Sequence, residues 1–229
     1  MPINYSKNIT EFLSGFRDEL PILIGVFPFG MIFAILAHQA GLSSLEAQAM
    51  SLIVFGGSSQ FMLVQLAGLK APIPVMIATG FIINLRHILY SASIAPYFKK
   101  ISSPWKLILS YLLTDEAYAV TISHFNKTNE SNKHWYFFGA GLALWSTWQL
   151  STLFGLFLGT QIPSNWSLDF TLALTFIALL IPMIKNRSDL LAALTAGIIA
   201  LTTVNFPYRL GLIVATLTGI IAGLWSEKH

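Results

Sequence analysis

The sequence predicts an all-α fold, a polytopic membrane helix bundle of about seven to eight transmembrane segments with broken helices. Three observations predict it. Hydrophobic residues make up 55% of the 229 residues and charged residues only 10%, whereas soluble domains carry about a quarter charged residues. The mean hydropathy is +0.67. Long apolar runs also follow one another, and a helix that spans a bilayer needs about 20 apolar residues. We therefore expect residues 1–229 to form a single integral domain in the cell membrane.

Composition also excludes several functions. The chain has no cysteine, which rules out disulfides and thiolate metal sites. Its basic residues are scattered between apolar runs, so they form no nucleic-acid footprint. No Gly-x-x-x-x-Gly-Lys loop indicates nucleotide hydrolysis, and transport would be driven by a gradient. We expect no cofactor, no metal, no nucleic-acid partner and no enzymatic activity.

The elements follow from hydropathy in chain order. Residues 1–19 mix charges with single apolar positions, which is not the pattern of a cleaved signal, and we interpret them as a short cytoplasmic lead-in. Eight candidate spans follow; the short seventh run could be re-entrant, which would leave seven. The runs cover residues 20–40, 46–69, 73–96, 106–124, 135–161, 168–184, 189–204 and 208–225.

Lysine and arginine in the loops predict the orientation, because they are enriched on the cytoplasmic side. With both termini inside, eight basic residues lie inside and four outside. The cluster Lys99, Lys100 and Lys106 falls on the outer side in this arrangement. If the second run were a re-entrant hairpin, the cluster would move inside and the count would become six against six, so this alternative stays open.

The first two runs each contain a motif that interrupts a regular helix. Phe27-Pro28-Phe29-Gly30 in the first run predicts a kink or a break, because proline removes a backbone hydrogen bond. Gly56-Gly57-Ser58-Ser59-Gln60 in the second run is polar and flexible. Transporters use unwound backbone of this kind to bind substrate. The alternatives are a kink that only shapes packing, and small residues that only let helices approach.

Two further motifs place opposite charges in adjacent runs. Asn84-Leu85-Arg86-His87 lies in the third run and Thr114-Asp115-Glu116 in the fourth. A charge at bilayer depth is costly unless it faces the bundle interior or water, so it marks a candidate transport pathway. A zwitterionic substrate needs a cation for its carboxylate and a carboxylate for its ammonium. The alternative is a structural ion pair between Arg86 and Asp115 or Glu116.

Two residues are candidates for coupling transport to protons. His87 titrates near neutral pH in its unperturbed state, so it could carry a coupling proton, or it could only donate a hydrogen bond to a neighbouring helix. Asp115 is the second coupling candidate.

Two mid-span residues are weaker signals of a site. Trp148 and Gln149 lie in the middle of the fifth run and could line the bottom of a pocket, although contact with lipid or another helix explains them better.

These motifs, in this order and spacing, resemble the AzlC family, the large subunit of bacterial branched-chain amino acid exporters. The resemblance covers about residues 12–225 and is most specific in the first half, although alanines often stand where this chain has Gly57 and Ser58. The motifs that carry it are Pro28-Phe29-Gly30, Gly41-Leu42-Ser43, Ser51 through Phe61, Asn84 through His87 with Tyr90 and Pro96, and Thr114 through Glu116.

The resemblance implies export of valine, leucine and isoleucine across the cytoplasmic membrane, with methionine and toxic analogues as an open extension of this range. It also implies a small membrane partner of the AzlD type, while assembly of several copies stays open. In this interpretation Arg86 faces the substrate carboxylate and Asp115 or Glu116 its ammonium. The apolar side chain would lie among Phe27, Phe55 and Phe61. The remaining candidate substrate-binding residues are Gly57, Ser58, Ser59, Gln60 and Asn84.

Two other classes of function compete with transport. An intramembrane hydrolase could use Ser59 as nucleophile and His87 as base, but no Gly-x-Ser-x-Gly elbow surrounds Ser59. A non-transporting scaffold or accessory subunit could use the buried charges only to bind its partner. The scaffold predicts that neutralising these charges disturbs assembly and leaves no substrate-specific defect.

Overall fold

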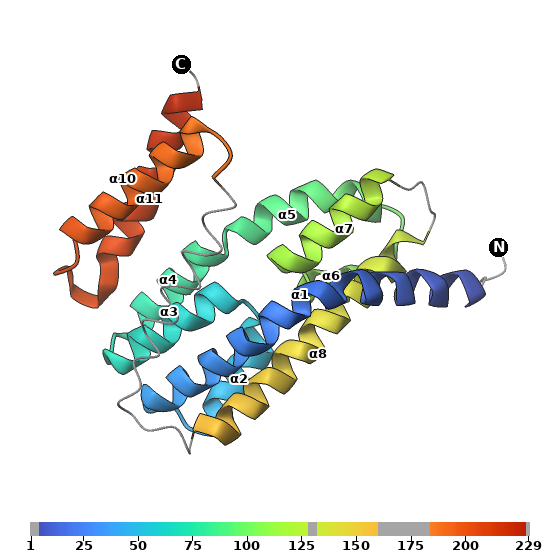
Figure 1. Ribbon diagram of the computed structural model, residues 1–229, viewed down its shortest axis with the longest axis horizontal. Coiled ribbons are helices and arrows are strands. Elements are labelled where there is room, and N and C mark those ends of the chain that lie inside the picture. The colour runs from blue at the N-terminus through green and yellow to red at the C-terminus, as the bar shows by residue number, and fades with distance from the viewer. Residues whose placement is uncertain (1–4, 128–131, 160–183, 228–229) are drawn as a thin grey trace.

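The computed structural model describes residues 5–127, 132–159 and 184–227, and every regular element among them is helical (Figure 1). This confirms the all-α class. The helices are α1 (Tyr5–Gln39), α2 (Ser44–Val54), α3 (Gly57–Gly68), α4 (Ile73–Asn84), α5 (Arg86–Ile94), α6 (Ser103–Tyr111), α7 (Asp115–Lys127), α8 (Lys133–Gly159), α10 (Arg187–Thr202) and α11 (Leu210–Glu227), with 3-10 turns at Ala95–Phe98 and Pro207–Arg209.

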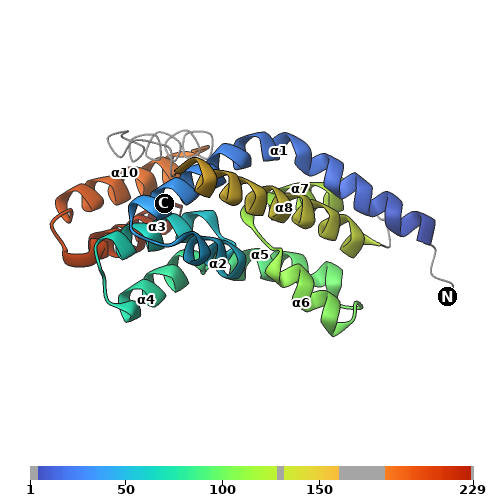
Figure 2. The ribbon, with the colours of Figure 1, turned by 90° about the horizontal axis from the view of Figure 1, so that it is seen from below.

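The bundle is organised around α1 and α8, its two longest described helices, which lie side by side in both views (Figures 1 and 2). Glycines let their backbones approach closely. A Cβ added at Gly15 would lie 2.0 Å from the carbonyl oxygen of Tyr136, and one at Gly139 would lie 2.0 Å from that of Phe12. A further close approach places Gly155 against Met31. Because no larger side chain fits at these points, the glycines set the spacing of the pair.

Helix α1 continues through both of its prolines, Pro21 and Pro28. Of the kink or break expected at Pro28, the break is therefore wrong, and the helix follows an arched course (Figure 2). Packing against α8 supports the helix where proline removes a hydrogen bond. The helix also begins at Tyr5, so the described part of the expected lead-in, residues 5–19, is its first half, and Glu19 in it is fully buried.

The second and fourth runs are each split into two helices. In the second run α2 ends at Val54 and α3 begins at Gly57, and Phe55 between them has a left-handed backbone with φ 38°. In the fourth run α6 and α7 are separated by residues 112–114. The third run differs, because Leu85 between α4 and α5 keeps helical dihedral angles. Its motif therefore interrupts the helix only slightly.

The last two described helices form a hairpin, drawn in orange and red in Figure 1. A capping box at Asn186 and Asp189 begins α10. Small residues join it to α11: a Cβ at Gly219 would lie 2.9 Å from the carbonyl oxygen of Ala192. The hairpin confirms the helices expected in the last two runs. Nearly all of the sixth run, 168–184, lies outside the described residues.

Three described stretches are long and apolar enough to cross a membrane, namely Ser6–Gln39, Ile73–Phe98 and Leu210–Glu227. Large apolar side chains such as Ile77, Phe81 and Ile88 are exposed along the second of them, which suits a lipid-facing surface. The membrane helix bundle is therefore confirmed. The number of spans and the side of each loop stay predictions.

Substitution of Gly139 tests the packing of α1 against α8. We expect Gly139→Ala to lower the stability of the protein by about 1–3 kcal/mol, because the added methyl group overlaps the backbone of α1. The measurement is thermal unfolding of the purified protein in detergent. Unfolding is monitored as the loss of the monodisperse fraction of the protein as the temperature rises. Gly197→Ala is the control, since a Cβ there meets nothing within 4 Å. Equal unfolding temperatures for the two variants would contradict the close contact.

Candidate functional site

A cavity of about 230 Å³ lies where the two broken runs meet the central helix pair; we call it the central cavity. Most of its wall is apolar. The apolar lining comes from Ile22, Gly25, Val26 and Phe29 of α1, Phe55 and Gly56 at the break between α2 and α3, and Leu144 and Trp148 of α8. The rest of the lining comes from Gly57 and Ser58 of α3, Arg86 of α5, and Thr114, Asp115 and Glu116 at the start of α7.

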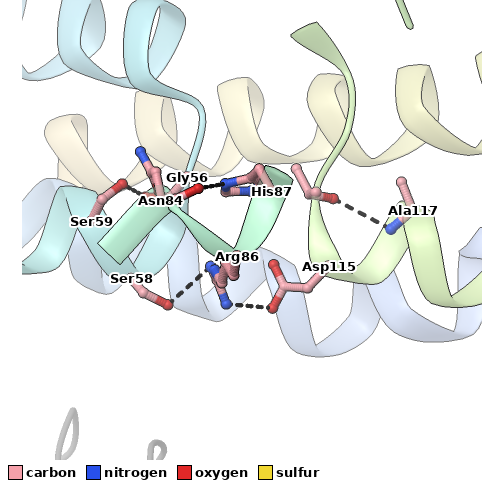
Figure 3. A network of polar contacts seen from close by, with 9 residues as sticks. Gly56, Ser58, Ser59, Asn84, Arg86, His87, Asp115 and Ala117 are labelled. Carbon is pink, nitrogen blue, oxygen red and sulfur yellow. Dashed lines mark hydrogen bonds and ion pairs between the residues drawn. The ribbon is translucent and has the colours of Figure 1, made fainter. Parts of the chain in front are cut away.

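An ion pair crosses this cavity wall (Figure 3). Arg86 Nη1 lies 3.1 Å from Asp115 Oδ2, and Arg86 Nη2 donates to Ser58 Oγ at 3.3 Å. The guanidinium Nε is buried and has no hydrogen-bond partner among the described residues. The side chains of Arg86 and Asp115 are 29% and 40% exposed, so both remain accessible from the cavity. Arg86 therefore links the breaks of the second and fourth runs, and its Nε–H remains available to donate a hydrogen bond.

The break between α2 and α3 is held by residues of its own segment. Ser59 Oγ donates to the Gly56 carbonyl at 2.8 Å, and Gln60 Oε1 accepts from the Gly56 amide at 3.2 Å. Ser59 and Gln60 are fully buried and are not among the lining residues. Their side chains satisfy the backbone groups that the break leaves without helical partners. Gly57 and Ser58 are thus left to face the cavity.

Two helices, α3 and α7, begin at the cavity. The first amides of a helix have no partner within it, and the helix dipole adds partial positive charge there. At α7, Thr114 Oγ1 accepts one of these hydrogen bonds, from the Ala117 amide at 3.3 Å. The start of α3 at Gly57 has no side-chain cap, since its N-cap residue is Gly56. The cavity therefore offers helix N-termini as well as Arg86 to a negatively charged group.

Of the Asn84–His87 motif only Arg86 lines the cavity. His87 Nδ1 is 3.1 Å from the Asn84 carbonyl oxygen, and the ring meets Tyr90 edge-on. Asn84 Oδ1 is buried on the Gly56 side, 3.3 Å from where a Cβ of Gly56 would lie. Ser59 and His87 are each engaged with their own segment, so the geometry gives no support to the hydrolase alternative.

The structure thus divides the residues that the sequence singled out. Those that line the cavity are Gly57, Ser58, Arg86, Asp115 and Glu116, whereas Ser59, Gln60, Asn84 and His87 do not. Of the aromatic residues expected around the substrate, Phe55 lines the cavity. Phe27 instead packs against Phe154, and Phe61 against Phe29 and Phe33.

Trp148 lines the cavity, although its sequence position favoured contact with lipid or another helix. It is 5% exposed, stacks on Phe33, and would lie 3.3 Å from a Cβ at Gly57. Its position in mid-run, away from the interfaces where tryptophan usually anchors helices, was the available signal. Gln149 instead joins helices, bonding to Gln48 and to the Ser51 carbonyl.

Comparison with known proteins places the chain in a family. Residues 21–162 match the family described as AzlC protein. The chain is 30% identical to an uncharacterized membrane protein of Archaeoglobus fulgidus, covering 95% of this chain and 96% of that one. It is 25% identical to inner membrane protein YgaZ of Escherichia coli, with 94% and 92% covered.

A third relative has a function in its name. The chain is 26% identical to the branched-chain amino acid transport protein AzlC of Bacillus subtilis, covering 80% of this chain and 72% of that one. No solved structure matches the chain. The matched region contains the central cavity and both of its helix breaks. The chain therefore belongs to the AzlC family, and its role is in transport across the membrane.

Proposed function

We propose that this protein is a gradient-driven secondary transporter that exports branched-chain amino acids. The observation that carries the proposal is the Arg86–Asp115 ion pair in the wall of a mostly apolar cavity. The name of the Bacillus subtilis relative, a branched-chain amino acid transport protein, supports the substrate class. The direction of transport and the range of amino acids are part of the proposal.

The ion pair can be exchanged for a zwitterion without leaving a charge alone. The substrate carboxylate takes the place of Asp115 against the Arg86 guanidinium, whose Nε has no hydrogen-bond partner among the described residues. The substrate ammonium takes the place of Arg86 beside Asp115 or Glu116. The uncapped N-terminus of α3 at Gly57 adds backbone donors to the carboxylate. The one ion pair is replaced by two, which compensates for removing the substrate from water.

The apolar wall suits a short aliphatic side chain. Ile22, Val26 and Leu144 supply branched aliphatic groups, and Phe55 and Trp148 close the wall with aromatic rings. The volume of about 230 Å³ lies below the range of about 300–1,000 Å³ usual for larger ligands. A charged or hydrogen-bonding side chain would lose its water here without gaining a partner. Valine, leucine and isoleucine therefore fit this wall best.

The proposal includes a small membrane partner of the AzlD type. The stretch Ile73–Phe98 has large exposed apolar side chains along its length, and these could meet a second transmembrane subunit as well as lipid. The site residues of this chain already supply both charges for the substrate. We therefore expect the partner to complete the transporter rather than to bind the amino acid by itself.

The test of the function is the release of leucine and valine from cells fed dipeptides that contain them. Cells would carry this chain alone, this chain with a small AzlD-type partner, or neither. We expect faster release with both chains. No change in any strain, with both proteins confirmed in the membrane, would exclude branched-chain amino acids as substrates.

The Arg86–Asp115 pair also supports the second candidate, a scaffold in which the pair only joins α5 to α7. The two functions differ in what replacement of Arg86 does. Arg86→Gln should reduce export to the level of cells lacking the chain, because the substrate carboxylate loses its cation, while the protein stays in the membrane. The measurements are leucine release and the amount of protein in membrane fractions.

Arg86→Lys serves as the matched comparison. Lysine keeps the charge but lacks the planar fork that binds a carboxylate through two hydrogen bonds. We expect this variant to retain part of the export activity and to need a higher leucine concentration than the unsubstituted protein. Loss of both variants from the membrane would favour the structural pair and the scaffold.

The break at Gly57 gives an independent test of the cavity. Gly57→Leu should abolish export, since even its Cβ would lie 3.3 Å from Trp148 and the rest of the side chain would occupy the cavity. The control is Gly197→Leu, where a Cβ meets no atom within 4 Å. Leucine release is measured at matched membrane levels. A fully active Gly57→Leu variant would mean that this glycine only serves helix packing.

A further inference from the structure

A second cavity, of about 350 Å³, lies between α5, the turn Ala95–Phe98, α6 and α8; we call it the peripheral cavity. One of its walls is α6, which lies at the lower edge of the bundle in Figure 2. The residues at its rim are exposed, so the cavity opens on the surface of the protein. Its bottom consists of buried apolar side chains, namely Ile94, Phe98, Leu109, Leu113 and Phe137. The peripheral cavity shares no lining residue with the central cavity.

Two lysines lie at one end of the peripheral cavity. The lining residues of each segment recur every three or four positions, so each segment presents one helical face to the cavity. Lys99 is the last lining residue of the first segment, and Lys106 is the first lining residue of α6. Because a turn of only four residues, 99–102, joins the two segments, both lysines belong to the end of the cavity that lies at this turn.

The charges of Lys99 and Lys106 are not balanced by the described residues. Both side chains are exposed at the rim, and a long aliphatic stem lets lysine contact an apolar surface while its ammonium group stays at the mouth. Among the described residues neither lysine pairs with a carboxylate, since the ion pairs found there join other side chains. The peripheral cavity therefore combines an apolar bottom with two positive charges at one end.

The charged end of the cavity lies where the membrane surface is expected. The apolar stretch Ile73–Phe98 is long enough to cross a membrane and ends at the residue before Lys99. Beside Lys106, the ring of Trp105 meets that of Trp135 edge-on with centroids 4.8 Å apart, and tryptophan is enriched at the membrane surface. From Lys106 the lining continues to Leu113, about 10 Å further along the chain if it is helical. The apolar bottom thus extends from the headgroup region toward the hydrocarbon region.

We propose that the peripheral cavity binds one anionic phospholipid, with its phosphate between Lys99 and Lys106 and an acyl chain along the apolar bottom. Basic pockets between transmembrane helices recognise anionic headgroups. A zwitterionic phospholipid fits less well, because its own cation is repelled by the two lysines. A free phosphate ion leaves the apolar bottom unused. The site does not depend on the proposed transport function.

The proposed lipid site adjoins the break in the fourth run. Leu113 lines the peripheral cavity, and the next two residues, Thr114 and Asp115, line the central cavity. Helix α6 has only nine residues, and a helix of this length depends on its neighbours for stability. A lipid in the peripheral cavity contacts both α5 and α6 and holds them together. Since a ligand of the folded protein stabilises it, the lipid should raise the unfolding temperature.

The headgroup contact is tested by native mass spectrometry of the purified full-length chain, titrated with phosphatidylglycerol or with phosphatidylcholine of the same acyl chains. Joint substitution of Lys99→Gln and Lys106→Gln should weaken phosphatidylglycerol binding by about thirtyfold, the usual effect of two lysines near an anionic lipid. Binding of phosphatidylcholine should not change. The control is Lys7→Gln with Lys70→Gln, which removes the same charge at exposed positions outside the cavity. Equal phosphatidylglycerol binding by the two double variants would overturn the proposal.

The acyl-chain contact is tested with Ala95→Trp, because Ala95 lines the cavity at its exposed rim and an indole there takes the space of the chain while both lysines remain. Phosphatidylglycerol should raise the unfolding temperature of the unsubstituted protein and leave that of Ala95→Trp unchanged. An equal rise in both proteins would overturn the proposal.

Two further measurements separate the lipid from other occupants of the peripheral cavity. Inorganic phosphate should neither bind nor displace phosphatidylglycerol, and phosphate binding that is lost with Lys99 and Lys106 would assign the site to a free anion instead. The complex with a small AzlD-type partner should retain the lipid. A complex that forms with the unsubstituted chain, fails to form with Ala95→Trp and contains no phosphatidylglycerol would assign the cavity to the partner and overturn the proposal.

Discussion

The rest of the structure depends on the cost of leaving a charge or an open backbone group in an apolar interior. In lipid each such group must find a partner inside the protein. The chain meets this constraint by bringing its polar groups to one place. Two helix breaks, one ion pair and Glu116 lie around the same cavity, and the buried Glu19 precedes Ile22, a lining residue of α1, by one helical turn. The site is therefore also where the backbone is least regular.

The central pair of helices makes these interruptions possible. Helices α1 and α8 remain unbroken over 35 and 27 residues, and their glycine contacts fix the distance between them. They supply most of the apolar wall of the cavity. The polar lining residues come from α3, from α5, and from Thr114 and the first turn of α7. The cavity thus has long continuous helices on one side and short helices on the other.

Much of this arrangement could be predicted from the sequence, for a physical reason. Arg86 and Asp115 pair because charges within apolar runs have few other partners, and Gly56-Gly57 marks a break because glycine adapts to irregular backbone. Other features depend on packing that the sequence does not reveal. Pro28 does not break α1, which packs along α8, and Ser59 and Gln60 bind the Gly56 backbone instead of lining the cavity. Glu19 lay in the expected lead-in, since burial begins before the hydrophobic run does.

The ion pair gives the proposed site a source of specificity. While Arg86 and Asp115 bind each other, a simple carboxylate could take Arg86 only by leaving Asp115 without its cation, and a simple amine would do the reverse. Each exchange leaves one charge without a partner beside an apolar wall, which costs free energy. A zwitterion replaces both partners at once. In the proposed function the ion pair is thus an internal substitute for the amino acid backbone, and the wall of Ile22, Val26 and Leu144 selects the side chain.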